Sequence, residues 1–124
     1  MKYREELPEG CPPAGAEQVN SDRDVFRLVR QSPPSQDDFR SRRAENPQAI
    51  FSVSECQARG LSVFADRRDC EKARKLPTLR GRLICRVRLV TGAGNLLETG
   101  GRSHHTWWPL AEYDILSRCQ VEAA

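Results

Sequence analysis

The sequence predicts a small α+β domain with a mainly antiparallel, curved sheet of about five strands and two or three short helices. Its length of 124 residues suits one hydrophobic core and is too short for two ordinary domains. Strand-like and helix-like segments alternate in the first half of the chain, whereas strand-like segments follow one another in the second half. That order is typical of an antiparallel sheet with helices packed on one side.

The first 22 residues are expected to be a flexible tail that precedes a single domain at residues 23–124. The tail holds prolines and glycines with few large apolar side chains, so it cannot bury enough surface to offset the entropy lost on ordering. Its first residues are charged rather than apolar, and no run in the chain approaches the roughly 20 apolar residues of a membrane span. We therefore expect a soluble, cytoplasmic protein that does not bind membranes.

The first regular elements of the domain are a strand and two short helical segments. Residues 25–29 are rich in β-forming side chains and are followed by Ser-Pro-Pro, which fits a strand that enters a rigid turn. Residues 36–43 contain few helix breakers and follow Ser35, which has capping-box spacing to Asp38. Residues 50–59 allow two interpretations: Ile50, Phe51 and Val53 favour a strand, whereas residues 54–59, closed by a glycine, favour one or two helical turns, which we expect.

A short strand and a longer helix are expected next. Residues 61–64 are consistent with a short buried strand. Asp66 then provides an N-cap for a helix over residues 67–76, in which Cys70, Ala73 and Leu76 form a narrow apolar stripe. Pro77 ends this helix.

The clearest element is a strand over residues 82–90, where apolar side chains alternate with arginines and one isoleucine. Glycines after it predict a hairpin turn, with residues 96–99 returning as the partner strand. Residues 104–108 and 113–121 are expected to complete the sheet.

The five cysteines of the chain are expected to be reduced core thiols. Their number is odd and they contain no C-x-x-C pair, so they do not form the pattern of a disulfide framework. The spacings typical of a zinc site are also absent. We predict neither a metal site nor a cofactor.

A run of basic residues gives the strongest electrostatic signal. Seven Lys and Arg residues, and no acid, lie between Lys72 and Arg88. Alternate residues on a strand share one face, so Arg82, Arg86 and Arg88 would form a ladder able to hold phosphate groups of a nucleotide or nucleic acid. The competing interpretation is a solvated strand face whose arginines pair with acids of neighbouring strands, such as Glu98, Glu112 or Asp114.

Both histidines and both tryptophans of the chain lie within residues 104–108. Strand alternation places His104, Thr106 and Trp108 on one face and His105 and Trp107 on the other. One face is expected to be exposed, so that Trp107 or Trp108 would offer a stacking surface to a base. The alternative is a purely structural role for these residues in the core.

An enzyme that acts on a nucleotide-like substrate is the second hypothesis. His104 or His105 would be the acid/base group, Glu98 its partner and Arg102 an anion clamp next to a mobile Gly100-Gly101 loop.

One order of residues also resembles the ADP-ribosyltransferase family. It consists of Arg27 on the first strand, Ser62 on a short middle strand and a late glutamate, Glu98 or Glu112. The Ser-Thr-Ser strand motif of that family is absent. The resemblance rests on three common residue types. It implies that, if the protein is an enzyme, ADP-ribosyl transfer is one reaction it could catalyse.

A protein partner is the third hypothesis. In this interpretation the chain is a regulatory or interaction subunit, and Trp107 or Trp108 anchors the interface, as aromatic hot spots do.

Overall fold

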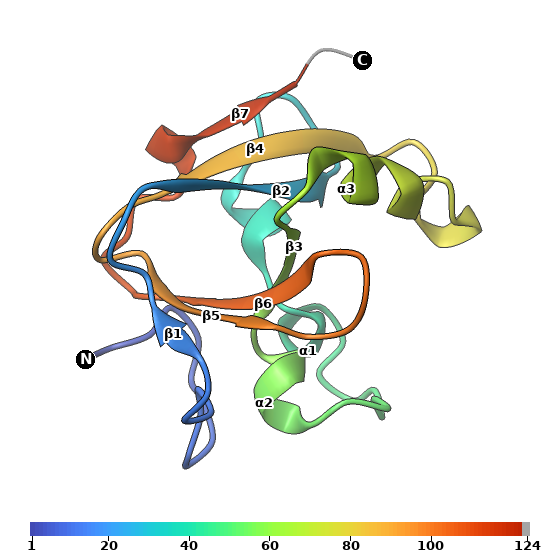
Figure 1. Ribbon diagram of the computed structural model, residues 1–124. Helices are drawn as coiled ribbons and strands as arrows, with labels where there is room; N and C mark the ends of the chain where they lie inside the picture. The colour runs from blue at the N-terminus through green and yellow to red at the C-terminus, as the bar shows by residue number, and fades with distance from the viewer. Residues whose placement is uncertain (123–124) are drawn as a thin grey trace.

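The computed structural model describes residues 1–122 and shows an α+β domain (Figure 1). Within these residues, seven strands form one open antiparallel sheet in the order β1-β5-β6-β3-β2-β4-β7, accompanied by three short α-helices. The α+β class and the antiparallel sheet are confirmed. The expected number of about five strands is too low. The edge strand β1 (Glu17–Gln18) has only two residues, too few to show an alternating pattern, and lies in the segment expected to be a tail.

The sheet is curved into two parts that β3 connects (Figure 1). One part consists of β2 (Arg23–Val29), β4 (Leu83–Leu89) and β7 (Cys119–Val121). The other consists of β6 (His104–Pro109), β5 (Gly94–Glu98) and β1 (Glu17–Gln18). The middle strand β3 (Leu61–Phe64) pairs with β6 over its whole length but meets β2 only at Phe26 and Phe64. The two parts therefore diverge beyond this single register pair.

Side-chain hydroxyl or carboxylate groups cap all three α-helices. Ser41 caps α1 (Arg42–Glu45), Ser54 caps α2 (Glu55–Ala58) and Asp66 caps α3 (Arg67–Ala73), each accepting a hydrogen bond from a backbone N–H of the first turn. The N-cap predicted at Asp66 is thus confirmed, and the capping box predicted between Ser35 and Asp38 is present. Short 3₁₀ helices span Gln36–Phe39, Pro77–Leu79 and Leu116–Arg118.

Two expected elements differ from the structure. The single helix expected over residues 36–43 is interrupted, because Arg40 has an extended backbone between the 3₁₀ helix and α1. The strand expected over residues 113–121 is limited to β7, since a 3₁₀ helix occupies Leu116–Arg118. Local alternation does not reveal either interruption. Near the first, the Asp38 carboxylate accepts hydrogen bonds from the N–H groups of Arg30 and Ser35. Near the second, Asp114 accepts hydrogen bonds from the N–H and hydroxyl groups of Ser117.

The core lies on one face of the curved sheet. Leu61 and Val63 of β3, Val87 and Leu89 of β4 and Trp107 of β6 are all essentially inaccessible to solvent and belong to one cluster. Successive residues of a strand point to opposite faces. Ser62 and Phe64, next to the core residues of β3, therefore lie on the other face, whereas Thr106 and Trp108, next to Trp107, are buried.

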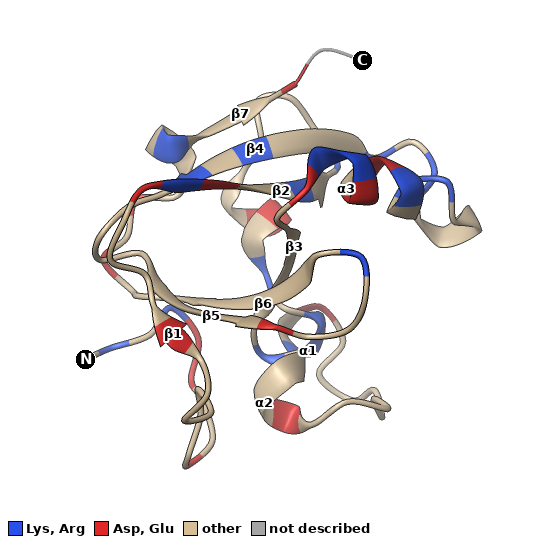
Figure 2. Ribbon diagram, in the orientation of Figure 1, with Lys and Arg blue, Asp and Glu red and all other residues tan. Residues whose placement is uncertain are grey.

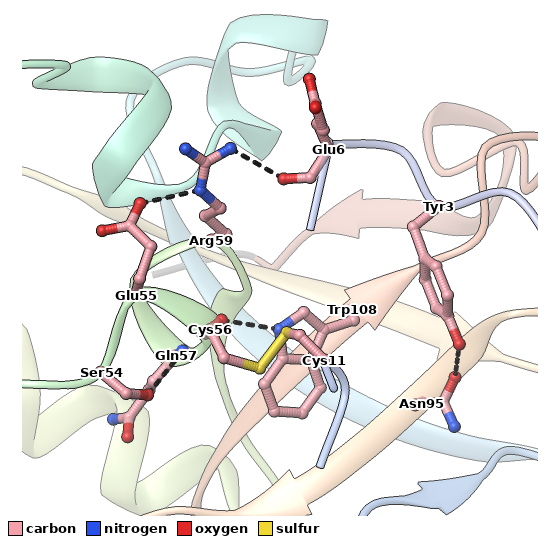
Figure 3. The surroundings of a disulfide bond; sticks show 10 residues. All are labelled: Tyr3, Glu6, Cys11, Ser54, Glu55, Cys56, Gln57, Arg59, Asn95 and Trp108. Carbon is pink, nitrogen blue, oxygen red and sulfur yellow. Dashed lines mark hydrogen bonds and ion pairs between the residues drawn. A yellow bond between two sulfur atoms is a disulfide. The ribbon is translucent and has the colours of Figure 1, made fainter. Parts of the chain in front are cut away.

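The segment expected to be a flexible tail lies against the domain instead. Residues 17–18 form β1, which pairs with β5, and Val19 is part of the core cluster. Cys11 is joined to Cys56 of α2 by a disulfide bond (Figure 3), which corrects the expectation that all five cysteines are reduced. The two cysteines are 45 positions apart, so only the folded chain brings them together. Cys70, Cys85 and Cys119 are free thiols.

None of the helices in the described part of the chain is long and apolar enough to span a membrane.

Candidate functional site

The candidate site is a cleft of about 820 Å³ beside the point where β2 and β3 diverge. This volume lies in the range of small-molecule sites. The cleft lies between α1 and the segment that follows α3, and residues of β2, β3 and β6 line it. Its polar lining residues are Arg27, Arg30, Arg40, Arg42, Glu45, Asn46, Ser62, Thr78, Arg82 and His104, and its other lining residues are Leu28, Gly60, Phe64, Ala73, Leu76 and Leu79.

The floor of the cleft follows from the alternation of β3 and β6. Leu61 and Val63 enter the core, so Ser62 and Phe64 project from the opposite face. The register places His104 of β6 opposite Phe64, and the two rings meet edge to face with their centroids 5.3 Å apart. The pair forms an aromatic surface with an imidazole at the cleft wall.

Arg27 is the most constrained cation of the cleft. Its guanidinium donates from Nε to the carbonyl of Asp38 at 2.9 Å, from Nη1 to that of Ser62 at 2.8 Å and from Nη2 to that of Arg40 at 3.4 Å. The bond to Ser62 lies where β2 and β3 diverge. The guanidinium therefore donates to a β3 carbonyl that has no backbone N–H of β2 opposite it. Three of the five N–H groups are used in this way, and two are left for a ligand.

The charge of Arg27 has no carboxylate in direct contact within residues 1–122. Burial lowers the pKa of Arg27 to about 10, while the carboxylates of Glu45 and Asp38 oppose this shift. The group still carries its charge at neutral pH. A partly desolvated cation without an ion pair is costly, and an anionic ligand would offset this cost.

Four further arginines line the cleft, and only one of them has a carboxylate partner. Arg30 pairs with Glu45 at 2.9 Å. Arg40 donates to the carbonyl of Ala44, and Arg42 lies over the ring of Phe51. Arg82 has no ion pair within the described residues, and its positive charge contributes to lowering the pKa of Arg27. The cleft therefore has a marked excess of positive charge.

His104 is held with one ring nitrogen available. Its Nδ1 lies 2.6 Å from the carbonyl oxygen of Thr99 and 3.0 Å from the Thr99 hydroxyl. A carbonyl oxygen only accepts, so the neutral ring carries its hydrogen on Nδ1 and presents Nε2 as an acceptor. Nε2 has no hydrogen-bond partner within residues 1–122, which makes it suitable for accepting a proton or a ligand hydroxyl hydrogen.

The structure separates the arginine ladder expected on β4. Arg82 precedes the strand and lines the cleft. Arg86 and Arg88 are exposed on the strand and line a different hollow together with Ser117 and Gln120. Arg88 forms an ion pair with Asp24 at 2.6 Å, so its acidic partner lies on β2 and is none of the three carboxylates expected from the sequence.

The expected catalytic group is separated as well. His104 and His105 point to opposite faces, as predicted, and only His104 lines the cleft. Glu98 is exposed and lies opposite His105 in the register. Arg102 is an exposed residue of the β5–β6 loop and does not line the cleft.

The β5–β6 loop is fixed to the segment after β3 rather than free on both sides. The carbonyl and hydroxyl of Ser103 accept hydrogen bonds from the backbone N–H groups of Ala65 and Asp66. The loop expected to close over a ligand is therefore anchored at its C-terminal end.

Both tryptophans are buried, so neither offers the exposed stacking surface expected from the sequence. Trp107 is 0% exposed and donates to the carbonyl of Ala93, and Trp108 is 1% exposed and donates to the carbonyl of Cys56. Alternation places them correctly on opposite faces, but both faces are covered here: the core lies on one side, and α2 on the other (Figure 3).

Chemistry based on thiolates or a metal ion has no support at this site. Burial raises the pKa of the Cys70 and Cys85 thiols to about 12, so both are protonated at neutral pH. No group of three or more His, Cys, Asp or Glu side chains with metal-binding geometry occurs within residues 1–122.

Sequence reasoning missed the arginines of α1 and the segment before it. Arg40 and Arg42 are close to acids in the sequence and carry no regular pattern. Arg27 and Ser62 entered only through the resemblance to ADP-ribosyltransferases, and both line the cleft, whereas Glu98 and Glu112 do not. The only local signal for Arg27 is that it lies between two apolar residues of the same strand, Val25 and Val29.

Comparisons with protein-family models, with curated proteins and with solved structures found no match to this chain.

Proposed function

We propose that the protein binds a phosphate-bearing ligand, a nucleotide or a nucleic acid, in the cleft between α1 and the segment after α3. The observation that carries this proposal is the partly desolvated guanidinium of Arg27, which has no carboxylate partner within the described chain and lies beside Arg82. Planar guanidinium groups suit phosphate oxygens because they donate two parallel hydrogen bonds.

The apolar part of the cleft supports a nucleotide rather than free phosphate. Leu28, Phe64, Leu76 and Leu79 line the same space as the arginines. Leu76 is one of the few large apolar residues exposed to solvent, at 54% of its surface. A base or ribose would cover these side chains while the phosphates contact the guanidinium groups.

Titration with ADP, followed by calorimetry, tests this proposal. We expect Arg82→Gln to weaken ADP binding by roughly 10- to 100-fold, since a hydrogen bond to a charged group contributes about 1.5–3 kcal/mol. Arg82 is preferable to Arg27 for this test because Arg27 also supports three backbone carbonyls.

The matched control is Arg86→Gln, which removes the same charge from an exposed site outside the cleft. It should leave the affinity for ADP unchanged within about two-fold, because surface substitutions away from a site have small effects. Equal weakening by both variants would show binding on the strand face instead, and equal affinity for adenosine and ADP would exclude recognition of phosphate.

A second candidate function, supported by a separate observation, is an enzyme acting on a nucleotide-like substrate. His104, whose Nε2 has no hydrogen-bond partner within residues 1–122, lines the same cleft as Arg27 and Ser62. The latter are two of the three residues that carry the resemblance to ADP-ribosyltransferases. In this candidate His104 is the acid/base group, and Thr99 takes the positioning role that the sequence suggested for Glu98.

Release of nicotinamide from NAD⁺, the common donor of ADP-ribosyl groups, tests this second candidate. His104→Gln should lower the rate by roughly 10²- to 10⁴-fold, as expected for loss of a general acid/base. His105→Gln, on the opposite face of β6, should retain the wild-type rate. Absence of turnover by the wild type, or full activity of the His104 variant, would eliminate the candidate.

The remaining expectations concern a protein partner and the location of the protein. An interface anchored by Trp107 or Trp108 loses support because both indoles are buried. Disulfides persist in oxidising compartments and are rare in the cytosol, so the bond between Cys11 and Cys56 favours an oxidising compartment over the cytoplasmic location expected from the sequence.

A further inference from the structure

A second basic hollow adjoins the cleft. It has a volume of about 660 Å³ and lies against the same segment after α3. Arg82 lines both spaces, and the consecutive residues Ala73 and Arg74 line the cleft and the hollow respectively. The two spaces are thus separated by little more than one stretch of chain.

The hollow holds more positive charge than its own acid neutralises. Glu71 is its only acidic lining residue, and it already pairs with Arg67 at 3.0 Å and with Arg74 at 3.7 Å. Lys75, Arg80 and Arg82 have no carboxylate partner in the described part of the chain. Figure 2 shows this basic stretch running from the end of α3 toward β4.

The segment between the two spaces is amphipathic. Leu76 and Leu79 line the cleft, whereas Lys75 and Arg80 line the hollow. A ligand that inserts an apolar ring on one side of this segment and continues past it with charged groups would satisfy both sides. Single-stranded nucleic acid has this chemistry, because bases alternate with phosphates along it.

We propose that the ligand is a single strand of nucleic acid, of which one nucleotide occupies the cleft while a neighbouring phosphate contacts Lys75 and Arg80 in the hollow. This inference rests on the proposed function and names its ligand class. A mononucleotide in the cleft would leave the cations of the hollow without a counter-charge, whereas a strand reaches both groups of cations.

Fluorescence anisotropy with eight-nucleotide oligo-dT and oligo-rU, compared with ADP as competitor, tests this inference. We expect an oligonucleotide to bind at least ten-fold more tightly than ADP at low salt. For two further phosphate contacts, the slope of log K against log salt should be steeper than that for ADP by about 1.4. The two oligonucleotides distinguish DNA from RNA as the source of the strand.

The informative variant is Lys75→Gln with Arg80→Gln, two exposed positions that line only the hollow. It should weaken oligonucleotide binding at least ten-fold and change ADP binding less than two-fold. Lys2→Gln with Lys72→Gln removes the same net charge from exposed positions that line neither space, and it should preserve oligonucleotide binding within about two-fold.

The two proposals fail in different ways. An oligonucleotide that binds no more tightly than ADP, or that is unaffected by loss of Lys75 and Arg80, would overturn the strand proposal and leave a mononucleotide in the cleft. If the double variant and its control weaken oligonucleotide binding equally, the oligonucleotide is attracted by the overall positive charge and not bound in the hollow, which would also overturn the strand proposal. If neither ADP nor an oligonucleotide binds at low salt, the proposed function itself is wrong.

Discussion

Gly60 shows how the absence of one side chain allows two elements to approach closely. The chain leaving α2 passes so close to β6 that a Cβ atom at Gly60 would lie 2.3 Å from Cγ2 of Thr106 and 3.0 Å from the indole nitrogen of Trp108. Neither neighbour moves easily. Thr106 is buried and hydrogen-bonded to Thr99, and the indole donates to the carbonyl of Cys56.

We therefore expect Gly60→Ala to lower the free energy of unfolding by about 1–3 kcal/mol, the usual cost of overpacking. Urea denaturation would measure this change. Gly101→Ala is the matched control, because a Cβ at Gly101 meets nothing within 4 Å, and its effect should stay within about 0.5 kcal/mol. Equal stability of the Gly60 variant and the wild type would mean that the approach to β6 is not tight.

At the scale of elements, α2 depends on its surroundings. It has four residues, too few for a helix to be stable by itself. Trp108 donates to the Cys56 carbonyl at 2.9 Å, and Arg59 donates to the carbonyl of Glu6 (Figure 3). Hydrogen bonds from Arg43 and Arg59 hold the pKa of Glu55 down to about 2. The Cys11–Cys56 disulfide adds a covalent link to the N-terminal segment.

Replacing Cys11 and Cys56 together by Ser should lower the free energy of unfolding by about 4 kcal/mol. This magnitude follows from the entropy of closing a loop between cysteines 45 positions apart. Thermal unfolding with and without a reductant provides the measurement. The reductant should lower the Tm of the wild type toward that of the double variant, whose own Tm should not respond. A wild-type Tm that is insensitive to full reduction would refute the expected contribution.

At the scale of the whole molecule, the site depends on the curvature of the sheet. Because β2 and β3 share only one register pair, the sheet opens beside Arg27, whose guanidinium fills the gap and faces the cleft. Residues from α1, β2, β3, β6 and the segment after α3 then meet around one space. These residues are tens of positions apart in the sequence, so no local sequence pattern predicts that they line one cleft.

Much of the secondary structure was nevertheless predictable. The alternation that identified β4 and assigned His104 and His105 to opposite faces is a local property, because successive strand residues always point apart. The hydroxyl and carboxylate caps are also local, since each acts within one helical turn. The edge strand β1 and the disulfide were missed because long-range pairing stabilises each of them. The strand expected over residues 113–121 is shortened to β7, and the interruption at Arg40 was not predicted.

The sequence by itself determined the α+β class, the strand faces and the surplus of arginine. Periodicity and composition express these properties directly. Only the tertiary structure decided which arginines act together, placing Arg27 and Arg82 beside His104 and leaving Arg86, Arg88 and Arg102 elsewhere. It also decided that both tryptophans are buried. The physical reason is that the exposure of a side chain, and the side chains it lies close to, depend on which segments pack over each face of the sheet. Those segments are distant in the sequence.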